Sequence, residues 1–264
     1  SILEGPMERT TDGGLTWNPV NTGDVEVQRL DPAQEGANIF TAVAFAPDNG
    51  SIAYTATVDG MHRSGTERGP INFYVSRNAG EDWNLAGTCE TCGGAKMLAV
   101  QPGDSNVVWA ATNNGVQVSR DGGKSWSGNL IEQYTRHSEM LGVAIRPGEP
   151  DTVLAAGAEA GMFRSTDGGN TWEPANVGLS TQLLHQVTFA PSNPDVAYVA
   201  THDGIYRSDD AGVSWVERNQ GLLYRFTTPI AVDPRDEDVV FAGSASEVYT
   251  THPNHFNPGL HEGE

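Results

Sequence analysis

Short runs of apolar residues, each ending in proline, recur along the 264-residue chain. A polar turn follows each run, then a strand of small residues, a turn and a third short strand. Such near-unbroken apolar runs are typical of strands that are buried on both faces. No stretch of ten or more residues shows a helical period, so the pattern predicts an all-β chain. The runs are residues 43–47, 98–102, 143–147, 187–191 and 230–234.

A second motif follows the third strand of most units. It contains a Ser or Thr, then an Asp or Asn two residues later, then a Gly, and it ends in Trp. The Asp can accept backbone N–H groups in a tight turn, and the Gly permits a positive φ. The Trp supplies a large apolar anchor. We predict a structural role for the key residues of the five copies, which are Asp12, Asn78, Asp121, Asp167, Asp210, Trp17, Trp83, Trp126, Trp172 and Trp215.

This motif resembles the Asp-box, or BNR, repeat S-x-D-x-G-x-[ST]-W. Sialidases, xyloglucanase-type glycosidases, sortilin-like receptors and photosystem II stability/assembly factors carry that repeat, and all are β-propellers. The resemblance extends over roughly residues 7–251. It is strongest to assembly-factor-like and generic BNR-repeat proteins, which act as binding scaffolds. In these families the box is a structural turn away from the binding face.

The last four box tryptophans are about 45 residues apart, a period typical of propeller blades with four strands. We therefore expect one β-propeller domain over residues 1–264, built of four-stranded antiparallel blades. Six blades are expected, with five or seven as alternatives. The ring would be closed by N-terminal strands, although residues 247–250 compete with residues 7–11 as the third strand of the closing blade. The expected units are blades at 40–89, 96–132, 140–178 and 185–219, outer closing strands at 5–30, inner closing strands at 227–251 and a tail at 252–264.

The formal net charge is −19, from 34 acidic against 15 basic side chains. Nucleic acids and anionic membranes need a cationic face, so the charge argues against both as the main partner. Solubility explains an acidic surface, and adaptation to salt is a sharper explanation. No stretch reaches the roughly 18 apolar residues of a membrane span.

The two cysteines, Cys89 and Cys92, form a single CxxC motif. Zinc normally needs four ligands, so a short loop disulfide is favoured, followed by a free thiol pair and then a metal site. We expect no cofactor. Residues 1–5 do not resemble a signal peptide, and we interpret them as a mature or trimmed end. An extracellular or periplasmic location is favoured over a cytoplasmic one.

Polar, aromatic and basic residues gather in loops that a propeller would place on one rim of its channel. A guanidinium group with a neighbouring aromatic ring suits a carboxylate or a sugar. The alternative is an ordinary solvated loop, and for His185 a satisfied structural histidine. The candidate ligand-binding residues are Tyr134, Arg136, His137, Glu139, His62, Arg63, His185, His202 and Arg225.

Glycoside hydrolysis requires two carboxylates roughly 5–10 Å apart. The weaker catalytic candidates are Glu139, Glu90, Glu159 and Asp203, which the sequence alone does not pair. The arginine motif that precedes the first box of sialidases is missing here. Our leading hypothesis is a monomeric, non-enzymatic scaffold that binds a protein or carbohydrate on the rim. The alternatives are a glycoside hydrolase or lyase, and a structural module of a larger secreted protein.

Overall fold

The computed structural model of the chain describes residues 7–20, 39–58, 71–132 and 139–245. These ranges contain nineteen strands and no helix, so the chain is all-β there, as the apolar pattern predicts. Each strand of a sheet pairs antiparallel with the next strand along the chain. The described part has no helix of a length and hydropathy suited to crossing a membrane.

Four sheets follow the expected order, and we number them blades 1 to 4. Blade 1 contains β3 (Ile39–Ala46), β4 (Asn49–Val58), β5 (Ile71–Ser76) and β6 (Asn84–Cys89). Blade 2 contains β7 (Ala95–Val100), β8 (Val108–Thr112) and β9 (Gly115–Ser119). Blade 3 contains β10 (Met140–Ile145), β11 (Val153–Gly157), β12 (Gly161–Ser165) and β13 (Glu173–Pro174). Blade 4 contains β14 (Leu184–Ala190), β15 (Asn193–Thr201), β16 (Gly204–Ser208) and β17 (Val216–Glu217).

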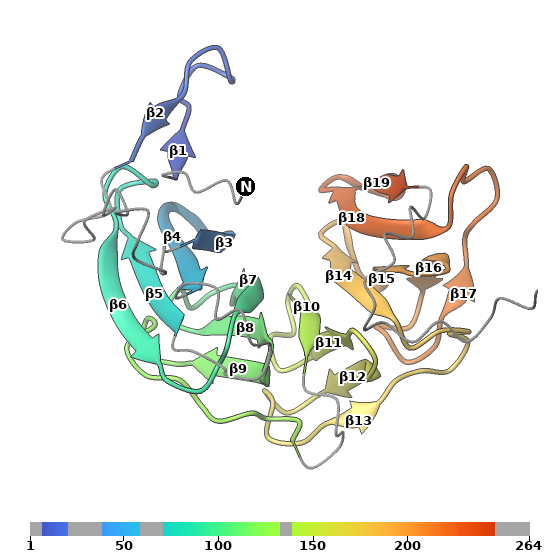
Figure 1. The fold of residues 1–264 in the computed structure, drawn as a ribbon. Coiled ribbons are helices and arrows are strands. Elements are labelled where there is room, and N and C mark those ends of the chain that lie inside the picture. Colours follow the sequence, from blue (N-terminus) through green and yellow to red (C-terminus); the bar gives the residue numbers. More distant parts are fainter. Residues whose placement is uncertain (1–6, 21–38, 59–70, 133–138, 246–264) are drawn as a thin grey trace, which may run out of the picture.

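Two smaller sheets lie at the ends of the series. The N-terminal hairpin contains β1 (Glu8–Arg9) and β2 (Asn18–Pro19), and the terminal pair contains β18 (Phe226–Asp233) and β19 (Asp236–Ala245). The sheets follow one another in a propeller-like arc around a central axis (Figure 1). The first strands of successive sheets contact one another, from β3 to β7, β10, β14 and β18, so they line the centre of the arc.

The arc is open between the N-terminal hairpin and the terminal pair (Figure 1). Among the described residues, β1 pairs with β2 and β18 pairs with β19. No strand pairing joins these two sheets in the part of the chain that the structure describes. Closure of the ring and the count of six blades are therefore not confirmed, and they stay predictions.

The second strand of each central blade is packed on both faces. All five residues of β8 and all five of β11 are buried. Neighbouring blades cover these strands from either side, and small residues such as Ala110 and Ala155 let the sheets approach closely. This packing explains why the second strands have almost no polar positions.

The Asp box at 119–126 shows how the repeated turn forms. The Asp121 carboxylate accepts the Ser125 N–H at 3.0 Å and the Ser125 hydroxyl at 2.6 Å. The Ser119 hydroxyl donates to Asp121 at 2.8 Å and accepts the Gly123 N–H at 2.8 Å. The corresponding bonds recur in the boxes at 165–172 and 208–215. The motif is therefore a local hydrogen-bonded unit that reverses the chain after the third strand.

Each box also joins its blade to the blade before it. The second strand of the preceding blade directs one large side chain at the fifth residue of the box, which is a glycine. A Cβ atom on Gly169 would lie 2.4 Å from Trp109, and one on Gly212 would lie 2.5 Å from Leu154. At Gly123 the same contact, with Tyr54, would be 3.6 Å. We call these contacts the box joints.

Two arginines add hydrogen bonds to the box joints. Arg120 of blade 2 donates to the Gly168 carbonyl at 2.7 Å, and Arg164 of blade 3 donates to the Ala211 carbonyl at 2.9 Å. Both carbonyls belong to the box of the following blade. The repeated placement of these arginines therefore has an inter-blade role that the sequence did not reveal.

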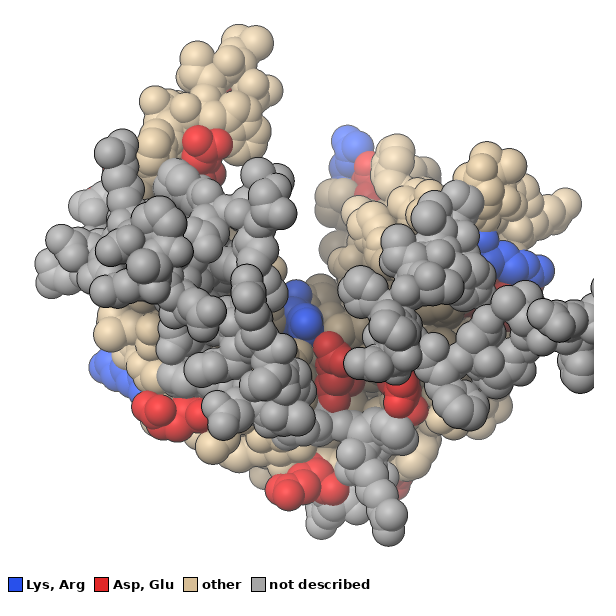
Figure 2. Space-filling model, viewed as in Figure 1, with Lys and Arg blue, Asp and Glu red and all other residues tan. Residues whose placement is uncertain are grey.

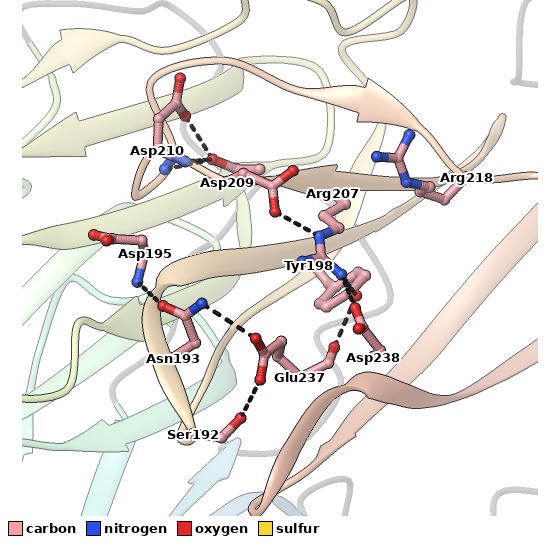
Figure 3. Close-up of polar contacts among 12 residues, drawn as sticks. Ser192, Asn193, Asp195, Tyr198, Arg207, Asp209, Asp210, Arg218, Glu237 and Asp238 are labelled. Carbon is pink, nitrogen blue, oxygen red and sulfur yellow. Dashed lines mark hydrogen bonds and ion pairs between the residues drawn. The ribbon is translucent and has the colours of Figure 1, made fainter.

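Blade 4 meets the terminal pair through a polar junction (Figure 3). Arg207 donates to Asp209 at 2.7 Å and to the Tyr198 hydroxyl at 2.8 Å, and it also pairs with Asp238 of β19. The Tyr198 hydroxyl donates to the Glu237 carbonyl at 2.8 Å. This network fixes β19 against blade 4.

Candidate functional site

The centre of the arc contains a cavity of about 610 Å³. Figure 2 shows the molecule hollowed between the two arms of the arc, with basic and acidic side chains next to each other at the edge of the hollow. The first strands of blades 1 to 4 and of the terminal pair all contribute to the wall. The lining residues are Ala42, Val43, Lys96, Met97, Leu98, Leu141, His185, Gln186, Thr228 and Pro229.

A repeated irregularity of the first strands places several of these side chains. The pairing register shifts between Ala95 and Met97, between Met140 and Gly142, between Leu184 and Gln186, and between Thr227 and Ile230. Bulges of this kind leave a residue out of the ladder and redirect its side chain. The residues left out at these four shifts all line the cavity: Lys96, Leu141, His185, Thr228 and Pro229. The same shift in blade 1, between Phe40 and Ala42, leaves out Thr41, which is not one of the lining residues.

An aromatic cluster lies where blade 4 meets the terminal pair. The His185 and His202 rings stack with centroids 5.4 Å apart. Phe226 contacts both rings edge-on, at 5.1 Å from His185 and 4.7 Å from His202. The Nε2 atom of His185 is buried without a hydrogen-bond partner. Burial, together with the charge of His202, lowers the pKa of His185, which favours the neutral imidazole.

An ion pair borders this cluster on the same loops. Arg225 pairs with Asp203 at 3.1 Å and with Glu217 at 3.3 Å. The Ser180 hydroxyl donates to Asp203 at 3.1 Å. The hydrogen bond to Asp203 and the charge of Glu217 raise the pKa of Arg225. These contacts hold the Arg225 guanidinium in place and offset its positive charge.

The rest of the rim contains one further ion pair and several exposed apolar or aromatic side chains. Lys96 pairs with Glu139 at 3.4 Å beside the cavity. Leu183, Leu223 and Tyr224 are exposed on the loops that lead into β14 and β18. The rim near blade 4 and the terminal pair is therefore apolar and aromatic, with its charges paired.

Several residues expected from the sequence come together in this arrangement. His185 and His202 are in ring contact, and Arg225 binds Asp203. Glu139 lies at a different point of the cavity mouth, beside Lys96. Glu159 lies in the turn between β11 and β12, and Glu90 lies in the loop between β6 and β7. The remaining candidates, Tyr134, Arg136, His137, His62 and Arg63, lie outside the described residues.

Sequence reasoning missed Lys96 and Phe226. A signal was present for Lys96, because it lies two positions before the buried part of its first strand, as His185 does. That position is the bulge, and it is the same in each blade. Phe226 gave no comparable signal, since its role comes only from contact with two histidines of another blade.

Cys89 and Cys92 form a disulfide with a Cα–Cα distance of 5.7 Å. Both cysteines are buried at the point where blade 1 passes into blade 2. The bond closes a short loop on the rim and leaves neither thiol for a metal. Within the described ranges, no group of three or more His, Cys, Asp or Glu side chains gathers in a way that could hold a metal ion.

Comparison with known proteins supports the repeat and the fold. Residues 117–127 match the BNR/Asp-box repeat family. The chain is similar to an ancestral GH74 enzyme, with 21% identity and a TM-score of 0.58, over 76% of this chain and 27% of that one. It is also similar to the GH74 enzyme of Niastella koreensis, with 20% identity and a TM-score of 0.62, over 78% and 33%. The GH74 xyloglucanase of Xanthomonas campestris matches with 15% identity and a TM-score of 0.53, over 90% and 47%.

These likenesses concern the fold alone. The chain spans less than half the length of each of these GH74 structures. A chain in the outer coat vertex of COPII on membranes matches with 12% identity and a TM-score of 0.56, over 86% of this chain and 66% of that one. A comparison with curated proteins gave no significant sequence match. The chain therefore carries the Asp-box repeat on a propeller-like all-β fold that proteins of different kinds share.

Proposed function

We propose that the chain is a non-enzymatic binding scaffold that recognises a protein or carbohydrate ligand on the rim of its central cavity. One observation carries the proposal. The bulges in the first strands of blades 2 to 4 and of the terminal pair direct side chains into the cavity, and His185 lies there beside the His202 and Phe226 rings. Rings of this kind offer a stacking surface to a ligand.

The paired charges favour binding over hydrolysis. Glu139 is neutralised by Lys96, and Asp203 by Arg225. A glycosidase needs one carboxyl group that stays protonated and a second that acts as base or nucleophile. Each of these carboxylates contacts a cation and not the second carboxylate that such a catalytic pair requires.

The same pairing favours an uncharged ligand group at this part of the rim. Lys96 and Arg225 already have carboxylate partners, so they offer little to an anionic ligand. A neutral sugar or an aromatic side chain of a protein fits the His185–His202–Phe226 cluster better. Five loop residues that lie outside the described part of the chain stay proposed members of the same site: Tyr134, Arg136, His137, His62 and Arg63.

The test is a glycan array that includes xyloglucan oligosaccharides, followed by calorimetry on any glycan that binds. We expect His185→Ala to weaken binding by about tenfold, the effect of losing an aromatic ring contact. The control is Arg235→Ala, because Arg235 is exposed and lies in the turn between β18 and β19, beyond the end of β18 that lines the cavity. Unchanged affinity in His185→Ala would contradict the proposed site.

A glycoside hydrolase is the second candidate, and the likeness to three GH74 structures favours it. Release of reducing ends from xyloglucan by the wild-type chain would support it. In that case Glu139→Gln should abolish turnover and leave substrate binding nearly intact, because a general acid acts in the transition state. A chain that binds glycan without turnover supports the scaffold instead.

We also propose a cellular location and an oligomeric state for the protein. A disulfide persists in oxidising compartments, so the Cys89–Cys92 bond supports an extracellular or periplasmic location. We propose a monomer whose six-bladed, closed ring presents the rim. The chain spans only part of the GH74 structures it resembles, which also fits a module of a larger secreted protein.

A further inference from the structure

The tripeptide Asn49-Gly50-Ser51 follows the turn between β3 and β4 of blade 1. An Asn with Ser or Thr two residues later, and no Pro between them, is the acceptor sequence for N-linked glycans in secreted proteins. No other Asn in the 264 residues has this spacing. A motif this short also occurs by chance, so its structural setting decides whether a transferase can use it.

The tripeptide lies outside the regular strand ladder of blade 1. The pairing register shifts between Phe45 and Ala46, and this shift leaves residues 50–52 without partners on β3. All three residues of the tripeptide are exposed. A Cβ atom on Gly50 would meet no other atom within 4 Å. The acceptor therefore lies on a protruding segment with open space around it, which an external enzyme needs in order to reach it.

The Asn49 side chain uses only its oxygen in the turn. Its Oδ1 atom accepts the Ser51 N–H at 3.1 Å. Asp104 of blade 2 and Asp236 of the terminal pair make the same bond after the first strand of their sheets, each at 3.0 Å to the N–H two residues later. An aspartate has no amide nitrogen, so the turn does not depend on that atom. A sugar on the Asn49 nitrogen therefore leaves the turn intact.

Blade 4 has an asparagine at the equivalent position, and its nitrogen is engaged. Asn193 occupies the register position of Asn49. Its Nδ2 atom donates to Glu237 of the terminal pair at 3.3 Å, and the next residue is Pro194, which excludes glycan transfer. Within the described ranges, the Asn49 Nδ2 atom and the Ser51 hydroxyl make no hydrogen bond. Both groups that a transferase must contact are therefore accessible only in blade 1.

The tripeptide lies at the end of blade 1 that is remote from the rim. Strand β3 contributes Ala42 and Val43 to the cavity wall before it runs to the turn. The Ser51 carbonyl accepts the N–H of Ala79 in the Asp box of the same blade at 2.9 Å. A glycan on Asn49 therefore extends from the side of the Asp boxes and leaves the cavity and the rim uncovered.

We propose that Asn49 is a site of N-linked glycosylation that receives its oligosaccharide from a polyprenyl diphosphate carrier. In the transfer the Asn49 Nδ2 atom attacks the anomeric carbon of the first sugar. The new C–N bond forms as the bond from that carbon to the diphosphate oxygen breaks. The amide nitrogen gives one proton to a base of the transferase, and the carrier leaves as its diphosphate. The proposal rests on the extracellular or periplasmic location proposed above, because this modification belongs to exported proteins.

Secretion of the full chain from cells that contain an oligosaccharyltransferase tests the site. We expect a band of reduced mobility that peptide N-glycosidase restores to the mobility of the unmodified chain, with the modified peptide mapped to Asn49 by mass spectrometry. Ser51→Thr should keep the glycan, whereas Asn49→Asp and Ser51→Ala should lose it completely. A reporter glycoprotein secreted by the same cells verifies that the transferase is active. An unmodified wild-type chain, or a glycan that persists in Asn49→Asp, overturns the proposal.

Asn49→Asp is also the matched control for folding. Since Asp104 and Asp236 hold the same turn, this variant should have the Tm of the enzymatically deglycosylated wild type. Loss of the glycan then reports the missing acceptor nitrogen and not a misfolded chain. The added signal sequence imposes secretion, and the readout needs no rim ligand. Failure of this proposal is therefore distinguishable from failure of the proposed location or of the proposed binding function.

Discussion

Leu154 of blade 3 lies directly against Gly212 in the Asp box of blade 4, where a Cβ atom would come within 2.5 Å of the leucine Cδ2. The same relationship joins Trp109 to Gly169. The same glycine therefore belongs both to the repeated turn and to the packing between blades. An Asp box both reverses its own strand and receives the core side chain of its neighbour.

Substitution of that glycine tests the joint. Gly212→Ala adds a methyl group against Leu154 and also forces a φ of +85° on a residue with a Cβ. The free energy of unfolding should fall by about 2–4 kcal/mol, from overpacking together with backbone strain. Gly221→Ala separates the two effects, because Gly221 has a φ of +87° but open space around it. Chemical denaturation that gives equal losses for both variants would refute the joint.

The box tryptophans should be large contributors to stability. Trp172 is buried, and its ring meets Trp109 of the preceding blade edge-on with centroids 6.1 Å apart. Trp172→Ala should lower the free energy of unfolding by about 3–5 kcal/mol, the usual cost of removing a large buried aromatic side chain. Urea denaturation measures this, with Leu15→Ala as a control at an exposed box position. A loss below about 1 kcal/mol would contradict the anchoring role.

The stability that the Asp boxes provide should be lost over a defined pH range. The Thr16 side chain lowers the pKa of Asp12 to about 2, and the Ser125 side chain lowers that of Asp121 to about 2. A carboxylate whose folded pKa lies below its unfolded value of about 3.9 stabilises the fold above that value. This stabilisation should be lost as the pH falls from about 4 to about 2, which thermal unfolding at stepped pH would reveal.

Asp121→Asn provides the matched variant for that experiment. The box at 76–83 already has Asn78, whose side-chain oxygen accepts the Asp82 N–H at 3.0 Å, so an amide can hold the turn. The variant should keep the turn but lose one titrating carboxylate. Its stability should therefore decline less steeply with acid than that of the wild type, and an equally steep decline would be inconsistent with a role for Asp121.

Salt should stabilise the protein. The net charge of −19 means that acidic side chains repel one another. At 0.1 M salt, repulsion between exposed charges more than about 10 Å apart is largely screened. We expect Tm to rise as NaCl increases from low to molar concentration, measured by scanning fluorimetry. Choline chloride at equal ionic strength is the control for a specific effect of sodium. A flat or falling Tm would argue against adaptation of the surface to salt.

The sequence by itself determined the Asp boxes and the succession of short strands in an all-β chain. Each depends on bonds or periodicity within a few residues, as between Ser119 and Asp121, so the local sequence is enough to specify it. The sequence also made His185 a candidate for the channel, because it lies two residues before a buried apolar run.

Only the tertiary structure decided which residues meet. Phe226 reaches His185 and His202, and Arg225 reaches Asp203, across the boundary between two sheets. Lys96 neutralises Glu139, which changes a candidate acid into half of an ion pair. Such contacts depend on how one blade is rotated against the next. That angle results from many packed side chains acting together, so no short stretch of sequence encodes it.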